Sequence, residues 1–214
     1  MTGPWGYPLT GDGDTALYTF LRWLAVPFFG GVYRCRVRGA EHLPSNGPAM
    51  VAMTHKCFWD PVIAGMVFRR PLRFMAKKEL FVNPAAAKFI GSLGAFPLDR
   101  GAGDRAALQT ALTILERGEI LLMFPEGHRQ TDDAVHEFMP GVGMIALRSG
   151  APVVPLALDG TQYILRDGKP GFPAIRGLVG PPVDLSDITT RNSKSYREAA
   201  ARMHAAVAGL YARL

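Results

Sequence analysis

The hydrophobic positions of the chain follow two patterns. Several short runs are apolar almost throughout, which is typical of strands that are buried on both faces of a sheet. Between them lie longer segments with apolar residues at helical spacing, as in Leu108 and Leu112, with Gly118 as the expected C-terminal cap. Strands that alternate with helices predict an α/β domain with a mostly parallel or mixed sheet flanked by helices. The expected strands are residues 32–38, 50–54, 72–76, 95–98, 120–124 and 153–158, and the expected helices are residues 62–69, 79–92, 104–117, 142–149 and 193–213.

The N-terminal segment differs from the rest, because residues 1–33 hold eight of the 21 aromatic residues. Residues 16–29 are mostly apolar with helical spacing, but this run is shorter than the roughly 20 residues that span a membrane. Asp12 and Asp14 stand where a signal peptide carries basic residues. Such a helix fits the plane of a membrane interface; the alternative is a helix packed on the protein's own core. We expect an amphipathic membrane-associating segment over residues 1–33 and one domain over residues 34–214.

Composition and charge narrow the class of partner. The chain has 214 residues, of which 48% are hydrophobic and 20% charged, so it can bury a core and is not a disordered chain. Its two cysteines, Cys35 and Cys57, offer neither a disulfide framework nor a paired zinc motif. The net charge of +6 favours an anionic partner, such as a phospholipid surface, a phosphorylated substrate or nucleic acid. We expect no nucleic acid, because the sequence shows no motif for binding it.

Residues able to do chemistry lie where the apolar runs end. His55 follows the run at residues 50–54, and Asp60 followed by Pro61 predicts the start of a helix. On a continuous helix these two residues would be about 140° apart, but a strand-to-helix turn can fold His55 back onto Asp60. A carboxylate there would fix the imidazole tautomer, as a general base requires. The alternative is that Asp60 only caps its helix and His55 is an ordinary loop residue.

Two further strand ends each carry an arginine close to a glycine. Arg100 follows the run at residues 95–98, and Arg129 follows the run at residues 120–124. Ligands of α/β proteins bind beyond the carboxyl ends of strands, and an arginine can hold a phosphate through two parallel hydrogen bonds. The alternative for either loop is a turn with a solvated arginine.

These segments, taken in order, resemble the blocks of the glycerolipid acyltransferase family, which includes the PlsC-like 1-acylglycerol-3-phosphate acyltransferases. The resemblance covers about residues 32–180. The matching segments are His-x4-Asp at residues 55–60, Lys-Lys-Glu-Leu at 77–80, a Gly-x-x-Phe-x-x-Arg-like stretch at 94–100, Phe-Pro-Glu-Gly-x-Arg at 124–129 and an apolar Val-Pro run at 153–158.

The resemblance implies a single acyltransferase domain that moves a fatty acyl group from acyl-CoA or acyl carrier protein to the hydroxyl of 1-acylglycerol-3-phosphate in phospholipid biosynthesis. It implies His55 as general base and Asp60 as its orienting partner, with no cofactor and no metal. It also implies an anionic phospholipid membrane surface and a lyso-lipid acceptor as partners, and a peripheral or monotopic location at the cytoplasmic face of the membrane. The implied substrate-binding residues are Lys77, Arg100, Glu126, Gly127 and Arg129.

Three residues depart from the usual family pattern, and they leave the acceptor open. His128 stands where a threonine is usual, Thr54 where many relatives have asparagine, and Gln130 where many have serine. The acceptor could therefore be another lysophospholipid or a glycolipid. Two alternatives of another class are a non-catalytic lipid-binding protein and a metallohydrolase built on His55, Asp60 and Glu126. We expect His42, His136 and His204 to be ordinary surface or core residues, and only backbone amides after Pro61 are candidate oxyanion donors.

Overall fold

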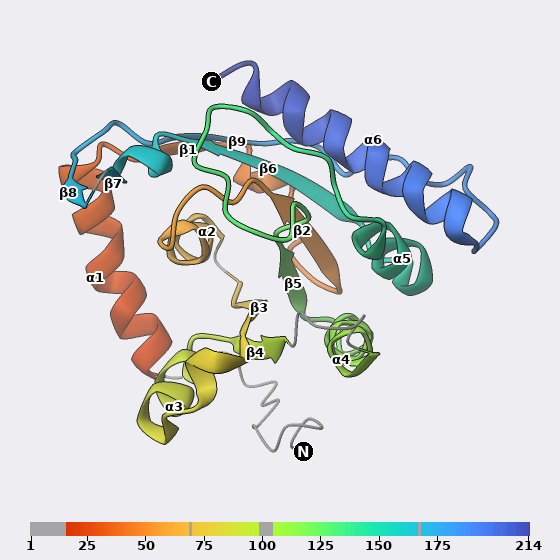
Figure 1. Cartoon of the computed structure of the whole chain (residues 1–214), viewed down its shortest axis with the longest axis horizontal. Coiled ribbons are helices and arrows are strands. Elements are labelled where there is room, and N and C mark those ends of the chain that lie inside the picture. The colour runs from red at the N-terminus through yellow and green to blue at the C-terminus, as the bar shows by residue number, and fades with distance from the viewer. Residues whose placement is uncertain (1–15, 69, 99–104, 167) are drawn as a thin grey trace.

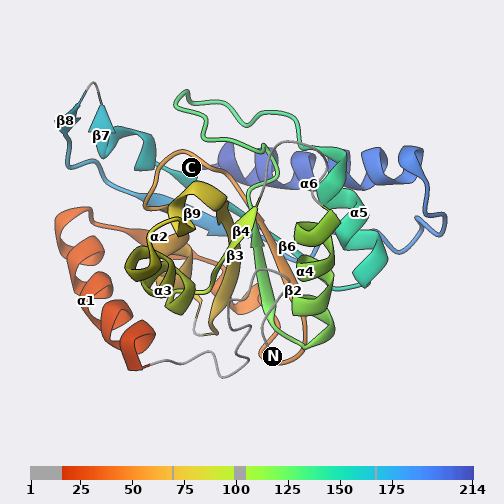
Figure 2. The ribbon, with the colours of Figure 1, turned by 60° about the horizontal axis from the view of Figure 1, so that its bottom comes forward.

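A twisted sheet forms the centre of the computed structural model, which describes residues 16–68, 70–98, 105–166 and 168–214 (Figures 1 and 2). Within these residues, seven strands pair in the order β1-β9-β6-β2-β5-β3-β4. Neighbouring strands are parallel, except that β6 and β9 are antiparallel. The mostly parallel α/β architecture is as predicted. The strands are β1 (Arg36–Arg38), β2 (Ala49–Met53), β3 (Leu72–Lys77), β4 (Ala95–Leu98), β5 (Ile120–Met123), β6 (Val153–Asp159) and β9 (Arg176–Val179), with β7 (Leu165–Arg166) and β8 (Lys169–Pro170) forming a separate hairpin.

Helices cover both faces of the sheet: α4, α5 and α6 lie on one side, and α1, α2 and α3 on the other (Figure 1). Side chains of β2 alternate between the two faces of the sheet. Met50 and Ala52 belong to the core beneath α4, α5 and α6, and Val51 and Met53 to the core on the side of α1 and α2. The α-helices are α1 (Ala16–Val32), α2 (Asp60–Val67), α3 (Pro84–Ser92), α4 (Arg105–Glu116), α5 (Pro140–Ser149) and α6 (Ser193–Tyr211), and the 3₁₀ turns are η1 (Ala40–His42), η2 (Lys78–Phe81) and η3 (Thr161–Tyr163).

The single helix expected over residues 79–92 is in fact two elements, η2 and α3. Pro84 disfavours a helical backbone at the residue before it, and Asn83 is accordingly extended. The Asn83 side chain then accepts hydrogen bonds from the amides of Ala85 and Ala86, at 2.9 and 3.1 Å, and caps α3. Proline chemistry therefore overrides the helical spacing.

Strand β9 was not expected. The strand expected at residues 32–38 is shorter, because α1 continues to Val32 and Arg34 has a left-handed φ of +46° instead of an extended backbone. β9 lies between β1 and β6, and Gly177 makes this close approach possible. A Cβ on Gly177 would lie 2.6 Å from the Leu158 side chain and 2.9 Å from the Val37 side chain. A close backbone approach of this kind has little signature in local periodicity.

Helix α1 packs on the protein's own core along part of its surface and leaves the rest exposed. Phe29 and Tyr33 are buried in the core on the α2 side, and the Tyr18 hydroxyl donates a hydrogen bond to the carbonyl oxygen of Gly65, at 3.4 Å. Trp23, in contrast, is 70% exposed. Among the described residues, no helix is long and apolar enough to cross a membrane. The division at residue 33 stays a prediction, and the core already includes residues on its N-terminal side.

Candidate active site

The turn that follows β2, residues 54–60, brings His55 and Asp60 together; we call it the catalytic turn. Nδ1 of His55 lies 3.0 Å from Oδ2 of Asp60. The same carboxylate oxygen accepts hydrogen bonds from the backbone amides of Lys56, at 2.6 Å, and Cys57, at 2.7 Å. The Asp60 side chain is fully buried, whereas 15% of the His55 side chain is exposed.

These contacts show that Asp60 does not act as a helix cap, the alternative role considered for it. α2 begins at Asp60, but its carboxylate binds groups that precede the helix instead of capping the first turn. Because an ionised carboxylate can only accept, Nδ1 of His55 carries the proton that is shared with Asp60. Nε2 then has a free lone pair, as a general base requires.

The other side of His55 is held by the segment that follows β5. The ring of Phe124 stacks on the imidazole. Oε2 of Glu126 accepts a hydrogen bond from the His55 amide, at 3.1 Å, and the amide of Gln130 donates to the His55 carbonyl oxygen, at 2.8 Å. Because β2 and β5 are parallel neighbours, both strand ends meet at one edge of the sheet. The backbone and the ring of His55 are therefore both fixed in place.

Thr54 anchors the start of the catalytic turn to the end of β6. Its hydroxyl donates to the carbonyl oxygen of Leu158, at 3.3 Å, and accepts from the Leu158 amide, at 3.1 Å. Thr54 is fully buried, so both hydrogen bonds form away from water. Thr54 therefore has a structural role at the start of the catalytic turn.

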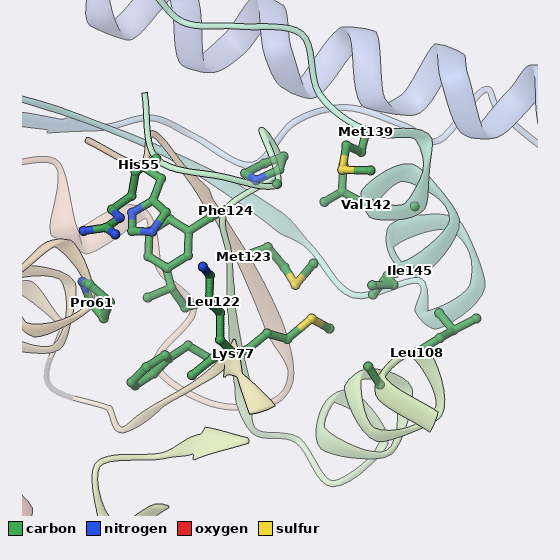
Figure 3. A pocket seen from close by; sticks show the side chains of 18 of the residues that line it. His55, Pro61, Lys77, Leu108, Leu122, Met123, Phe124, Met139, Val142 and Ile145 are labelled. Carbon is green, nitrogen blue, oxygen red and sulfur yellow. The ribbon is translucent and has the colours of Figure 1, made fainter. Parts of the chain in front are cut away.

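A cavity of about 460 Å³ opens in front of His55 and extends between β3 and β5 on one side and α4 and α5 on the other (Figure 3). Lys77 extends from the end of β3 into this space, and Arg129 and Gly127 line it from the segment after β5. The remainder of the lining is mainly apolar. Its apolar members include Leu108, Leu122, Met123, Met139, Val142 and Ile145.

The other predicted residues lie in three different situations. Glu126 is only 4% exposed, and its Oε1 accepts a hydrogen bond from the backbone amide of His136, at 3.0 Å. The ring of His128 is exposed, with its Nε2 3.0 Å from Nε2 of Gln130. Arg100 falls within residues 99–104, outside the described part of the chain.

Gly127 has a conformation that suits glycine. Its φ of +79° lies in the left-handed region, and a Cβ at this position would lie 2.6 Å from the sulfur of Met139. The chain can therefore turn sharply after Glu126 and bring Arg129 to the cavity.

Sequence reasoning missed Lys56 as part of this site. Its side chain has no exposed surface and reaches from the catalytic turn to the segment after β5. A lone lysine in a loop has no signature that distinguishes it from a solvated one. The contacts of His136 and Gln130 were also missed, since both act through backbone amides that any residue supplies.

Comparisons with known proteins bear on this geometry. The family model described as Acyltransferase matches residues 34–159, which include His55, Asp60 and Glu126. The chain belongs to the acyltransferase family. The matched range ends at the last residue of β6, so it holds all of the strands that position the catalytic turn.

Named relatives of this acyltransferase share most of its length. It is 31% identical over 169 residues to the 1-acyl-sn-glycerol-3-phosphate acyltransferase of Bacillus subtilis, an alignment that covers 77% of this chain and 80% of the relative. It is 28% identical to the enzyme of the same name from Streptococcus pneumoniae, with 90% and 72% covered. The crystal structure of the 1-acyl-sn-glycerophosphate (LPA) acyltransferase PlsC from Thermotoga maritima matches with a TM-score of 0.70 and 25% identity, covering 93% of this chain and 84% of that one.

Proposed function

We propose that this acyltransferase moves a fatty acyl group from a thioester to the free hydroxyl of 1-acylglycerol-3-phosphate. The thioester is acyl-CoA or the acylated form of acyl carrier protein. The observation that carries the proposal is the oriented His55–Asp60 pair at the mouth of an apolar cavity that also presents Lys77 and Arg129. The names of the relatives support the same acceptor. The proposed reaction needs neither a metal nor a bound cofactor.

His55 is the proposed general base. Its Nε2 takes the proton of the acceptor hydroxyl as that oxygen attacks the thioester carbonyl carbon. When the tetrahedral intermediate collapses, the carbon–sulfur bond breaks and the departing thiolate takes the proton from the imidazolium. Asp60 holds Nδ1 throughout and stabilises the positive charge that His55 carries in between.

Lys77 and Arg129 are the proposed phosphate ligands on the described part of the chain. Both line the cavity near His55 and keep exposed side chains, so an incoming anion can reach them. A phosphate monoester carries one to two negative charges near neutral pH, and charge-assisted hydrogen bonds to it are strong. Arg100 is proposed as a third ligand from the resemblance of its segment alone.

The two acyl chains of the reaction need apolar surface close to His55. The cavity in front of His55 supplies some of it, and a second cavity of about 640 Å³ lies between α1, α2 and α3. Both volumes are in the usual range for ligand sites. Five residues line both cavities: Phe58, Pro61, Phe74, Ala76 and Leu80.

The proposed membrane surface lies on the side of α1 and α3. Large apolar side chains are exposed there, and no other part of the described chain covers them. An exposed apolar patch of this kind is typical of a binding surface. An anionic phospholipid membrane fits the net charge of +6, and the proposed location is its cytoplasmic face. The exposed side chains are Phe20, Trp23, Leu24, Val26 and Phe28 of α1, Phe58 and Trp59 of the catalytic turn, and Leu80, Val82 and Phe89.

Mass spectrometry of the products tests the proposal. The protein is incubated with each thioester donor and with a panel of lyso-lipids: 1-acylglycerol-3-phosphate, a lysophosphodiester and a glycolipid. We expect diacylglycerol phosphate from the first acceptor, and none with His55→Ala, which removes the base. Product confined to the other acceptors would contradict the phosphate monoester as substrate. A requirement for metal, seen as loss of activity with a chelator, would favour a metallohydrolase instead.

A further inference from the structure

Lys56 is buried beside the proposed base and holds the facing segment through its side chain. The ammonium group donates hydrogen bonds to the backbone carbonyl oxygens of Asp132, at 2.9 Å, and Ala134. It lies 3.6 Å from the Asp132 carboxylate and 5.3 Å from the centroid of the Tyr211 ring. A buried charge is costly unless it is paired in this way. The contacts of Lys56 therefore favour one position of residues 132–134 strongly over any other.

Glu126 makes the opposite link, from the facing segment to the catalytic turn. One carboxylate oxygen accepts from the amide of His55, at 3.1 Å, and the other accepts from the amide of His136, at 3.0 Å. The side chain is almost fully buried. Both oxygens are thus bound to the main chain, one on each side of the site.

The segment held between these two contacts forms a wall of the cavity. We call residues 126–139 the acceptor segment, because Gly127, Arg129 and Met139 line the space in front of His55. Figure 1 shows this long connection leaving β5 and running towards α6 before it returns to α5. It contains no regular secondary structure of its own, so its side-chain and backbone contacts determine where it lies.

We propose that Lys56 and Glu126 are positioning residues that set the distance between the acceptor segment and His55. Glu126 acts through the main chain and does not touch the acceptor; Lys56 acts from the catalytic turn on the same segment. The inference rests on the proposed function, because it concerns the site that the acceptor would occupy. A small displacement of a reacting group can cost about 100-fold in rate.

The test compares Lys56→Met and Glu126→Gln with the wild type, and uses Lys194→Met as control. Methionine and glutamine keep the approximate volume and remove the charge, and Lys194 is an exposed lysine at the start of α6. Two quantities are measured with 1-acylglycerol-3-phosphate in vesicles: the KM of each substrate and the ratio of acyl transfer to thioester hydrolysis. Neither quantity depends on how much of the preparation is folded, so lost stability alone does not change them.

We expect both variants to raise the acceptor KM and lower the transfer-to-hydrolysis ratio, each by about 10-fold or more, while the donor KM changes less than twofold. The double variant should lose less than the product of the two single losses, because both changes release the same segment. Lys194→Met should match the wild type.

Two outcomes would overturn the inference. An unchanged acceptor KM and ratio in Lys56→Met would show that Lys56 does not position the segment. The second outcome is that only Glu126→Gln changes the acceptor KM and the ratio, and that the double variant shows the product of the two single effects. It would show that Glu126 contacts the acceptor directly. A wild type without transfer to this acceptor would instead contradict the proposed function. Where Lys56→Met gives too little folded protein to assay, Glu126→Gln alone decides: an unchanged ratio contradicts the inference.

Discussion

The rings of Phe124 and His55 are stacked, with centroids 3.9 Å apart and planes inclined by 26°. Asp60 binds Nδ1 of the ring. The imidazole could still tilt about this hydrogen bond, and the face of Phe124 limits that tilt. We expect Phe124→Ala to lower kcat by about 2- to 12-fold, the factor that corresponds to the coupling energy of an aromatic pair. Phe124→Tyr, which keeps the ring, should stay near the wild-type rate. Steady-state kinetics measures both; an unchanged kcat in Phe124→Ala would show that Asp60 alone orients the ring.

Asp60→Asn should separate activity from folding. The amide oxygen can still accept hydrogen bonds, but it carries no charge to stabilise a positively charged His55, so kcat should fall by about 10²- to 10⁴-fold. The amides of Lys56 and Cys57 also lose a charged acceptor, so the variant should be about 1 to 3 kcal/mol less stable. Product formation and thermal unfolding measure the two effects. A kcat within threefold of the wild type would remove Asp60 from the catalytic machinery.

Changes at the cationic side chains should distinguish a phosphate monoester from a neutral headgroup. With 1-acylglycerol-3-phosphate as acceptor, Arg129→Ala and Lys77→Ala should each raise the acceptor KM by about 10- to 100-fold, because a charge-assisted hydrogen bond is lost. Arg129→Lys should recover only part, since lysine lacks the planar fork. The same measurement on Arg100→Ala tests the ligand proposed from the resemblance. If a glycolipid acceptor shows the same rise in KM, these side chains do not bind the phosphate.

Charge placed on the exposed face of α1 should weaken membrane binding. Because Phe29 and Tyr33 are buried in the core, removal of residues 1–33 would disrupt packing, and a point change is the better probe. Trp23→Glu removes an apolar anchor, so it should lower sedimentation with anionic liposomes. The binding that remains should be more sensitive to salt than that of the wild type, because it depends on attraction between charges, which salt screens. The matched control is Ala205→Glu, which adds the same charge to an exposed position of α6, on the opposite side of the molecule (Figure 1). Equal binding of the two variants would contradict the proposed membrane face.

The two cysteines should react slowly with thiol reagents. Burial raises the pKa of Cys35 to about 11 and also raises the pKa of Cys57, which lies in the catalytic turn. A raised pKa leaves less thiolate at pH 8, and the thiolate is the reactive form. Alkylation at pH 8 should be slower than in the unfolded chain and should accelerate as the pH rises. Rates equal to those of the unfolded chain would contradict the partial burial of both thiols.

Local sequence signals predict much of this fold, and the reason can be seen in particular residues. The apolar residues of β2 belong to both core layers, so the whole run is hydrophobic and reads as a doubly buried strand. The chain must turn directly after it, because Pro61 favours the start of a helix there. A strand-to-helix turn of this kind can bring His55 and Asp60 together, and in the structure Nδ1 of His55 lies 3.0 Å from Oδ2 of Asp60.

The unpredicted features depend on contacts between distant segments. From the sequence alone, Gly177 is indistinguishable from a glycine in a loop. In the structure it lies in β9, and the side chains of Leu158 and Val37 on the two neighbouring strands leave no room for a Cβ. The resemblance implies Glu126 as an acceptor ligand, which stays a prediction, but the sequence gives no sign that its two oxygens accept hydrogen bonds from the amides of His55 and His136. Such contacts follow from tertiary packing, which local periodicity does not encode.

The position of β2 in the sheet has a consequence for how the molecule fluctuates. All five of its residues are buried, and it is paired along its length with β5 and β6. Amide hydrogens in such a strand exchange with solvent only when the whole domain opens, whereas those in an irregular connection exchange through small local openings. His55 is therefore attached to the part of the protein that opens last. We therefore expect any rearrangement that admits a lipid to involve the helices around the cavity, while the base stays in its place.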